Sequence, residues 1–226
     1  MKRWLIPLVA AAAIALLLVG AGCSTTGTTA TAGNSKAATT ASSTADGDND
    51  GLPDNAEALL GTDPQNADTD GDGQNDKDDP KPVSAENPIT ETSTTRGFKI
   101  DSVLAENNVD DAGADAPDHL EITVSNTATT DISEGWDLYY TLTDQKTGDV
   151  QSFYMTLPGF SVPAGKTVRL HVDTSAADGH FRADPNSSFY TGDNQLKIEA
   201  TLHAKGYAPQ TDSVLKDAAS AEAGGD

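Results

Sequence analysis

Two short acidic segments constrain the fold of this chain more than any other feature. They span residues 46–57 and 68–79. Each places oxygen-bearing side chains at positions 1, 3, 5, 9 and 12 and glycine at position 6. Residues 46–80 hold twelve acidic residues and one basic residue, Lys77, for a net charge of −11. Because these carboxylates repel one another and few apolar side chains accompany them, we expect the segment to fold only as it binds cations.

The spacing within each segment is typical of a calcium loop. Calcium takes six to eight oxygen ligands, and carboxylates on alternate residues of a curling loop converge on one point. Glycine at position 6 lets the backbone turn sharply. The sequence therefore predicts calcium as the bound cofactor. The expected ligands are Asp46, Asp48, Asp50, the carbonyl of Leu52, Asp54 and Glu57 in the first loop, and Asp68, Asp70, Asp72, Gln74, Asp76 and Asp79 in the second.

The two loops differ at position 12. Glu57 can reach a cation with both carboxylate oxygens, whereas Asp79 is one methylene shorter. We therefore expect fewer protein oxygens and weaker binding at the second loop. The alternative is a solvated, disordered acidic run, but such a run would not repeat glycine and carboxylates in the same register.

Two common calcium-binding architectures fit this segment poorly. An EF-hand needs a helix before each loop, but the Ser/Thr-rich residues before Asp46 have no apolar period. Pro53 also lacks the backbone N–H through which paired EF-hand loops join. A dockerin-like module needs a long helix between its loops, and Gly61 and Pro64 interrupt residues 58–67.

Residues 46–57, the connector 59–64 and the run 68–80 together resemble the thrombospondin type 3 repeat of prokaryotic surface proteins. The resemblance implies a chain wound around calcium ions, with little apolar core, that acts as a rigid spacer. We expect a short helical turn over Asp54–Leu60, ended by Gly61.

The first 22 residues have the features of an export signal. Lys2 and Arg3 give a positive start, residues 4–19 are almost entirely apolar, and small residues precede Cys23. These residues resemble a prokaryotic lipoprotein signal peptide, with Gly20 where Leu, Val or Ile is usual. The resemblance implies a lipid on Cys23 and an extracytoplasmic protein anchored to the cell membrane. A permanent transmembrane helix is the alternative.

Composition divides the remaining chain into four parts. Residues 23–45 are rich in Ser, Thr, Ala and Gly and predict a flexible tether. Residues 81–95 are a Pro- and Ser/Thr-containing linker between the acidic segment and a β domain over residues 96–216. Residues 217–226 are a polar tail that we expect to be disordered.

The β domain is predicted from alternation of apolar and polar residues, which is typical of strands with one buried face. Further short strands are expected at Ser188–Thr191 and residues 213–215, and turns at residues 144–149 and 163–166. The alternating apolar positions are Phe98 and Ile100; Leu120, Ile122 and Val124; Trp136, Leu138, Tyr140 and Leu142; Phe153, Met155 and Leu157; Val168, Leu170 and Val172; and Leu196, Ile198, Ala200 and Leu202.

This pattern predicts an all-β fold, an immunoglobulin-like two-sheet sandwich preceded by the calcium-loop segment and the flexible tether. Residues 122–127 and 162–168 resemble the immunoglobulin-like modules of prokaryotic surface proteins, including the cell-adhesion-related bacterial domain. The resemblance bears on fold class more than on function.

The sequence offers no clear catalytic centre, and we expect no enzyme. No nucleophile elbow or phosphate-binding glycine loop occurs. The histidines are scattered without the spacing of a zinc site, and His171 and His203 read as surface imidazoles. Tyr139 and Tyr154 are predicted to face away from the core and are the better candidates for ligand contact. A third cation site competes with a solvated loop at Asp110, Asp111, Asp115 and Asp118.

The net charge of −21 makes nucleic acid an improbable partner, because two polyanions repel. The expected partners are calcium ions, the membrane through Cys23, and an extracellular protein or polysaccharide. The sequence therefore favours a lipid-anchored surface protein whose calcium-stiffened spacer presents an adhesion or scaffolding module. The alternatives are a secreted hydrolase or substrate-binding accessory module, and a structural envelope component without a discrete ligand.

Overall fold

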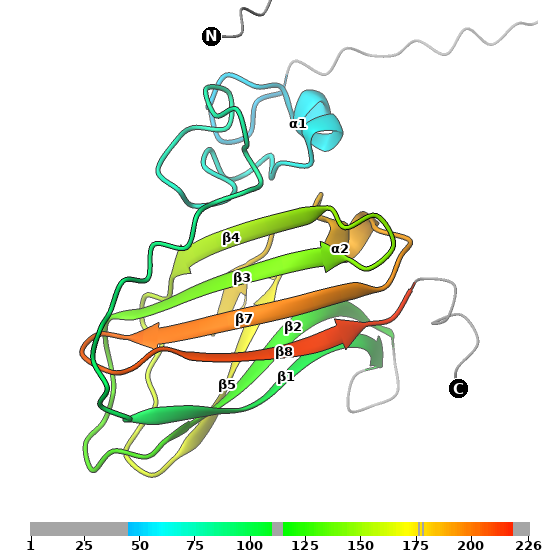
Figure 1. Cartoon of the computed structure of the whole chain (residues 1–226). Helices are drawn as coiled ribbons and strands as arrows, with labels where there is room; N and C mark the ends of the chain where they lie inside the picture. The colour runs from blue at the N-terminus through cyan, green and yellow to red at the C-terminus, as the bar shows by residue number, and fades with distance from the viewer. Residues whose placement is uncertain (1–44, 110–114, 176, 178, 219–226) are drawn as a thin grey trace, which may run out of the picture. The chain divides into compact units, whose positions relative to one another are not determined.

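The computed structural model describes residues 45–109, 115–175, 177 and 179–218. Cys23, the predicted export signal, the predicted tether up to residue 44 and the end of the tail lie outside these residues, as do Asp110 and Asp111. The described chain forms eight strands and two short helices (Figure 1). Their bounds are α1 Asp54–Leu60, β1 Phe98–Val109, β2 Asp115–Asn126, β3 Trp136–Asp144, β4 Val150–Thr156, β5 Thr167–Asp173, β6 His180–Arg182, α2 Ser188–Thr191, β7 Leu196–Ala204 and β8 Gln210–Lys216.

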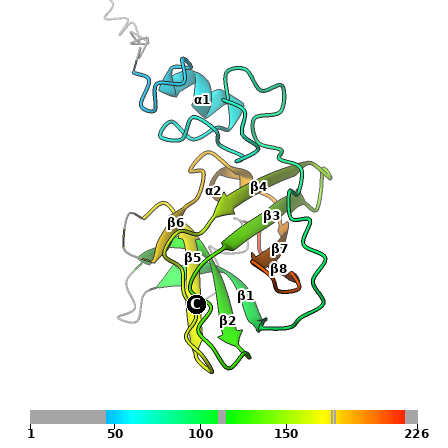
Figure 2. The ribbon, with the colours of Figure 1, turned by 90° about the vertical axis from the view of Figure 1, so that its left-hand side faces the viewer.

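The strands form two four-stranded sheets that pack face to face (Figures 1 and 2). One sheet has the order β1-β2-β5-β6 and the other has the order β4-β3-β7-β8. All pairs are antiparallel except β5 with β6. The orders β1-β2-β5 and β4-β3-β7-β8 correspond to strands A-B-E and C′-C-F-G of an immunoglobulin fold. The predicted all-β, two-sheet sandwich is confirmed.

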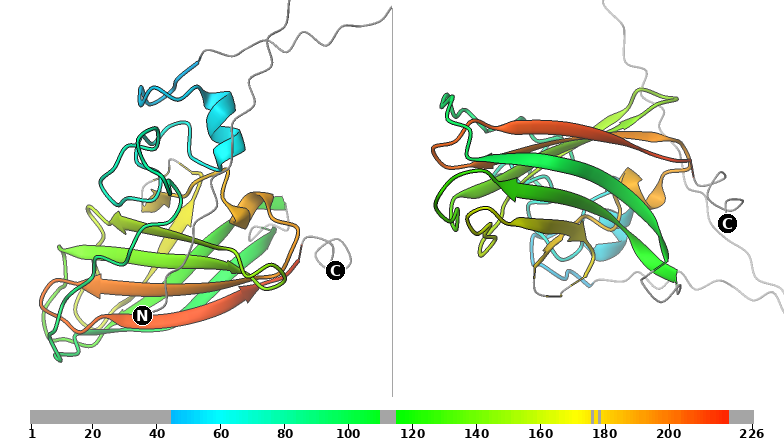
Figure 3. Two further views of the ribbon diagram at one scale, coloured as in Figure 1. Left: turned by 45° about the horizontal axis from the view of Figure 1, so that its top comes forward. Right: turned by 90° about the horizontal axis from the view of Figure 1, so that it is seen from below.

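The core lies between the two sheets, where the alternating apolar residues meet. Trp136 begins β3 and is 2% exposed. Its ring packs edge-on against Phe98 and Phe160, with centroids 4.8 and 5.2 Å away. The indole N–H donates to the carbonyl of Ile132 at 3.1 Å, so burial leaves no polar group of this side chain unpaired. At the edge of the sandwich β1 and β8 lie side by side (Figure 3).

The predicted turns have the expected geometry. Residues 144–149 connect β3 and β4, and Gly148 takes φ = 80° while its N–H donates to the carbonyl of Asp144 at 2.9 Å. The Asp144 side chain accepts the N–H groups of two further turn residues, which fixes the loop. The turn at residues 163–166 closes with a 2.9 Å bond from Lys166 N to Pro163 O, directly before β5.

One predicted strand is wrong. Ser188–Thr191 forms the helical turn α2. Ser187 Oγ donates to the carbonyl of Asp184 at 2.8 Å, and the Ser187 carbonyl accepts the N–H groups of Tyr190 and Thr191. Local bonds of this kind satisfy the backbone without a neighbouring strand. The strand predicted over residues 213–215 is present within β8.

The residues that follow the acidic segment pack on the sandwich. Ala85 N donates to Ser152 O and Ser152 N donates to Val83 O, both at 3.0 Å, so this stretch adds a short parallel bridge to the edge of β4. Ser152 Oγ also donates to the carbonyl of Ala85 at 2.7 Å. The predicted linker is therefore hydrogen-bonded to the sandwich where it passes β4.

Candidate metal centre

The first acidic loop gathers three carboxylates around one point. Oxygens of Asp46, Asp48 and Asp50 all lie within 4.8 Å of one another. Each side chain uses one oxygen to accept a loop N–H: Asp48 from Asp50 N at 3.0 Å, Asp46 from Gly51 N at 3.2 Å, and Asp50 from Leu52 N at 2.5 Å. The other oxygen of each aspartate is buried and has no hydrogen-bond partner. The loop therefore turns three acceptor atoms inward and leaves them unused.

Glu57 of helix α1 adds a fourth carboxylate near this cluster. The helix begins after Pro53 and ends at Gly61, which takes φ = 81°, as predicted. The Glu57 side chain is 0% exposed, and neither of its carboxylate oxygens has a hydrogen-bond partner. Desolvation, followed by the negative charges of Asp48 and Asp50, raises the pKa of Glu57 to about 7.

The remaining predicted ligands of the first loop have structural contacts. Asp54 Oδ1 accepts the N–H of Gly47 at 2.9 Å, which closes the loop. Leu52 donates its N–H to Asp50, and its carbonyl stays a predicted ligand. Gly51 takes φ = 93°, and an added Cβ there would lie 2.6 Å from Nζ of Lys77. Position 6 therefore needs glycine for its backbone angle, whereas the flexible Lys77 side chain could move aside.

The second loop also gathers three carboxylates, but its oxygens are occupied. Oxygens of Asp68, Asp70 and Asp72 lie within 4.8 Å of one another. Asp68 accepts two N–H groups of the loop at 3.0 Å, and Asp70 accepts the N–H groups of Asp72 at 3.0 Å and Ser84 at 2.8 Å. Gln74 donates its backbone and side-chain N–H groups to the two oxygens of Asp72. Burial raises the pKa of Asp70 to about 6.

Positions 9 and 12 of the second loop accept hydrogen bonds from outside its carboxylate cluster. Asp76 is 3% exposed and accepts both the N–H and the hydroxyl of Thr69, at 2.8 and 2.6 Å. Asp79 Oδ1 accepts the N–H of Lys81 at 2.7 Å. Asp79 therefore supplies no buried, unpartnered oxygen comparable to those of Glu57.

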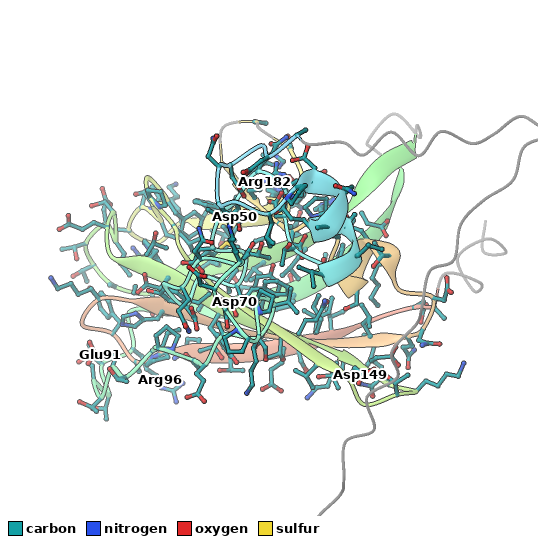
Figure 4. All side chains as sticks on the ribbon, turned by 90° about the horizontal axis from the view of Figure 1, so that it is seen from above. Asp50, Asp70, Glu91, Arg96, Asp149 and Arg182 are labelled. Carbon is teal, nitrogen blue, oxygen red and sulfur yellow. The ribbon has the colours of Figure 1, made fainter. Side chains whose placement is uncertain are left out.

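The connector between the two loops is bonded to the sandwich through Thr62 and Asp63. Asp63 is 1% exposed and accepts a two-pronged contact from Arg182 of β6, at 2.5 and 2.6 Å. Asn186 Nδ2 donates to the carbonyl of Thr62 at 2.6 Å. Arg182 is labelled in Figure 4, which shows the side chains from above. The acidic segment and the sandwich thus share specific polar contacts.

The second loop is also bonded to the sandwich. Tyr154 of β4 donates its N–H to the carbonyl of Asp70 at 2.7 Å. Gly71, at φ = 79°, lies so close to this strand that an added Cβ would be 2.0 Å from the Tyr154 carbonyl oxygen. Tyr139 and Tyr154 are only partly buried, and the Tyr139 hydroxyl donates to the carbonyl of Ala85 at 3.4 Å. Contacts within the chain therefore use part of the surface predicted for ligands.

The predicted third cation site is only partly described. Asp118 forms an ion pair with Lys216 at 3.0 Å, and Lys216 is buried. The side chain of Asp115 lies outside the described residues.

One cluster of ionisable groups is not evident from the sequence. His119, His171 and His180, which are scattered along the chain, lie on neighbouring strands around the buried carboxylate of Glu121. His203 also differs from a surface imidazole: it is 13% exposed and its Nδ1 lies 3.0 Å from Asp137. The two-residue spacing of His119 and Glu121 indicates part of this cluster, because it places both side chains on one face of a strand.

Comparisons with known proteins give no family for this chain. No family model and no curated protein matches it. Among solved structures, a Bacteroides uniformis β-glucuronidase aligns with 54% of this chain and 13% of its own, at 14% identity and a TM-score of 0.29. The sporulation control protein Spo0M of Bacillus subtilis aligns with 53% of this chain and 48% of its own, at 14% identity and a TM-score of 0.26. Neither likeness extends to a functional argument.

No helix within the described part of the chain has the length and apolar character needed to cross a membrane.

Proposed function

We propose that residues 46–80 bind calcium in an extracytoplasmic protein that is anchored through lipid on Cys23, and that the sandwich is an adhesion or scaffolding module. One observation carries the calcium assignment. Asp46, Asp48, Asp50 and Glu57 together hold five buried oxygens without a hydrogen-bond partner. An unpartnered buried carboxylate is costly, and a hard cation at this point relieves the cost for all four side chains at once.

The contacts of the connector add to this proposal. Because Arg182 holds Asp63 and Tyr154 holds the second loop, the acidic segment and the face of the sandwich beside β4 and β6 form one surface. We propose that calcium fixes this composite surface for a protein or polysaccharide partner outside the cell. The spacer and the module then act together.

Titration calorimetry of the full chain tests the calcium assignment. We expect dissociation constants of ~0.1 to 1 mM, the range of extracellular modules, with the first loop tighter. Asp50→Asn removes a charge at the cluster, whereas Asp78→Asn removes the same charge from an exposed side chain of the same segment. Only D50N is expected to weaken the first site. Absence of calcium heat at millimolar concentration, or equal effects of both variants, contradicts the assignment.

Capture of partners from the cell surface, with and without calcium, tests the adhesion or scaffolding role. The proposal expects a partner that is retained with calcium and lost on chelation. Retention of a partner that does not depend on calcium contradicts the composite surface. Failure to retain any component favours a structural envelope role.

A second candidate function, a hydrolase or substrate-binding module, is supported by one cavity of about 370 Å³. His203 lines it with Nδ1 3.0 Å from Asp137, and its Nε2 is buried without a hydrogen-bond partner, 3.9 Å from Glu91. A carboxylate that orients an imidazole is the arrangement of a general base. Turnover of an ester or glycoside substrate that is abolished by His203→Ala, with calcium binding intact, would support this candidate.

A further inference from the structure

The outer face of the β1-β2-β5-β6 sheet carries a cluster of imidazoles far in sequence from the acidic loops. Leu120, Ile122 and Leu170 point into the core, so His119, Glu121 and His171 point to the opposite face. The register of the sheet aligns them. Glu121 of β2 lies opposite His171 of β5, and His171 lies opposite His180 of β6. These three strands are neighbours in Figure 2.

The donor atoms are close enough to share one ion. One ligand atom from each of His119, Glu121 and His171 lies within 4.8 Å of the others. Nε2 of His171 is 3.9 Å from Oε2 of Glu121, beyond a direct hydrogen bond. Zinc bonds to imidazole nitrogen and carboxylate oxygen at about 2.0 to 2.2 Å, so neighbouring ligand atoms in a tetrahedral site lie roughly 3.3 Å apart. Small side-chain rotations would bring these groups to that spacing.

The two oxygens of Glu121 face different neighbours in the described structure. Glu121 is only 3% exposed although it lies on the outer face of the sheet. Oε1 lies 3.3 Å from Nε of Arg169 and accepts the Thr123 hydroxyl at 3.4 Å. Oε2 faces His171. Arg169 therefore orients the carboxylate from one side, as a group outside the ligand set of a metal site does.

A third imidazole supports this cluster. The His180 ring stacks on His171 with centroids 4.8 Å apart, and its Nδ1 lies 2.6 Å from Asp173. His180 thus supports the ring of His171 and is itself fixed by a carboxylate.

We propose that His119, Glu121 and His171 form a second, chemically distinct metal site that binds a borderline divalent transition ion such as zinc. Two nitrogens and one carboxylate oxygen suit zinc and its first-row neighbours, whereas calcium prefers oxygen ligands alone. Three protein ligands leave a fourth position for water or for a ligand from a partner. The ion would join β2 to β5 across the sheet.

Zinc titration of the full chain, without a polyhistidine tag and with excess calcium to fill the acidic loops, tests this site. We expect one zinc ion per chain. His119→Ala, His171→Ala and Glu121→Gln should each weaken zinc binding by at least the roughly 10- to 100-fold that follows removal of an orienting group. The matched control is His203→Ala, which removes an imidazole that is paired with a carboxylate but has no second imidazole beside it in the described structure.

A second readout separates ligation from general stability. On addition of zinc to the wild-type chain, the imidazole NMR signals of His119 and His171 should shift while those of His203 stay in place. Cobalt offers a further probe, because tetrahedral nitrogen and oxygen ligation gives it visible absorption bands that the H171A variant would lack. Zinc binding that is unchanged in H119A and H171A, or signals that shift equally for all histidines, overturns the proposal and leaves a hydrogen-bonded cluster without a metal role.

Discussion

The two acidic loops have the same spacing in the sequence, yet the structure uses their oxygens differently. In the first loop five carboxylate oxygens are buried without a partner. In the second loop the carboxylates of Asp68, Asp70 and Asp72 accept N–H groups from the loop, from Gln74 and from Ser84. A matching motif therefore predicts which side chains gather, and the hydrogen bonds determine which of them depend on a cation.

Position 12 accounts for much of this difference. Glu57 stands on a helix and keeps both carboxylate oxygens buried without a partner, while the shorter Asp79 accepts the N–H of Lys81. The first loop is therefore expected to need its ion to be stable. The second loop has a hydrogen-bond network and a contact to β4 that stabilise it without one.

The largest expected effect on calcium binding comes from removing the charge at position 12 of the first loop, and the second loop provides the comparison. Glu57→Gln should weaken calcium binding at the first loop by at least about tenfold, or roughly 1.4 kcal/mol, because a buried bidentate carboxylate is lost. Asp79→Asn should change the second site much less. Calorimetry of the two variants measures the contrast, and equal losses would show that both residues coordinate calcium alike.

Chelation is the next test, and it compares the loops with the sandwich. Without calcium, residues 46–57 should lose amide protection first, since like charges then face one another without compensation. The sandwich should stay folded because it has its own apolar core. Hydrogen exchange with and without a chelator measures both. Loss of protection throughout β1 to β8 would show that the sandwich also depends on calcium.

Sequence patterns gave the fold in considerable detail, because strand alternation and turn residues act locally. The helical turn at Asp54–Leu60 and both turns of the sandwich needed only neighbouring residues. Ser188–Thr191 forms a helical turn and not the predicted strand, because local hydrogen bonds to Ser187 outweigh the apolar character of the segment. The Asp63–Arg182 pair joins residues 119 positions apart, and no local sequence pattern predicts it.

The candidate sites, too, could be predicted only where their residues are close together in the sequence. The acidic loops could be predicted because their ligands are contiguous. The imidazole cluster could not, because His119 and His171 meet only through the register of β2 with β5. The unequal use of oxygens in the two loops likewise depends on contacts with Ser84, outside the motif.

The contact between the connector and the sandwich should have a moderate effect. Arg182→Gln leaves the buried Asp63 carboxylate without its two-pronged partner, which costs about 1 to 3 kcal/mol. The loss should fall on the docking of both loops, while calcium affinity at the first loop changes little because its ligands are local. Chemical unfolding and calorimetry measure the two quantities. Arg182→Lys is the control for charge, and it should recover only part of the stability because it cannot form both bonds.

The smallest expected effect is a pH dependence at the same contact, centred on Asp184. Desolvation raises the pKa of Asp184 from 3.8 to about 7, and its Oδ2 is buried without a partner. Since the folded-state pKa is above the unfolded value, the stabilising contribution is complete below pH ~3.8 and is lost as the pH rises through about 7.

Asp184→Asn should therefore match the wild type near pH 4 and exceed it at pH 8, by on the order of 1 kcal/mol once relaxation around the buried charge is allowed for. Unfolding of the wild type and of D184N between about pH 4 and pH 8, at constant calcium, measures the difference in their stability. Titration of the calcium ligands affects both proteins alike and therefore cancels in this difference. A difference that is the same at every pH would show that Asp184 is charged throughout. The docking of the connector would then not depend on pH through this contact, and neither would the contrast between the loops.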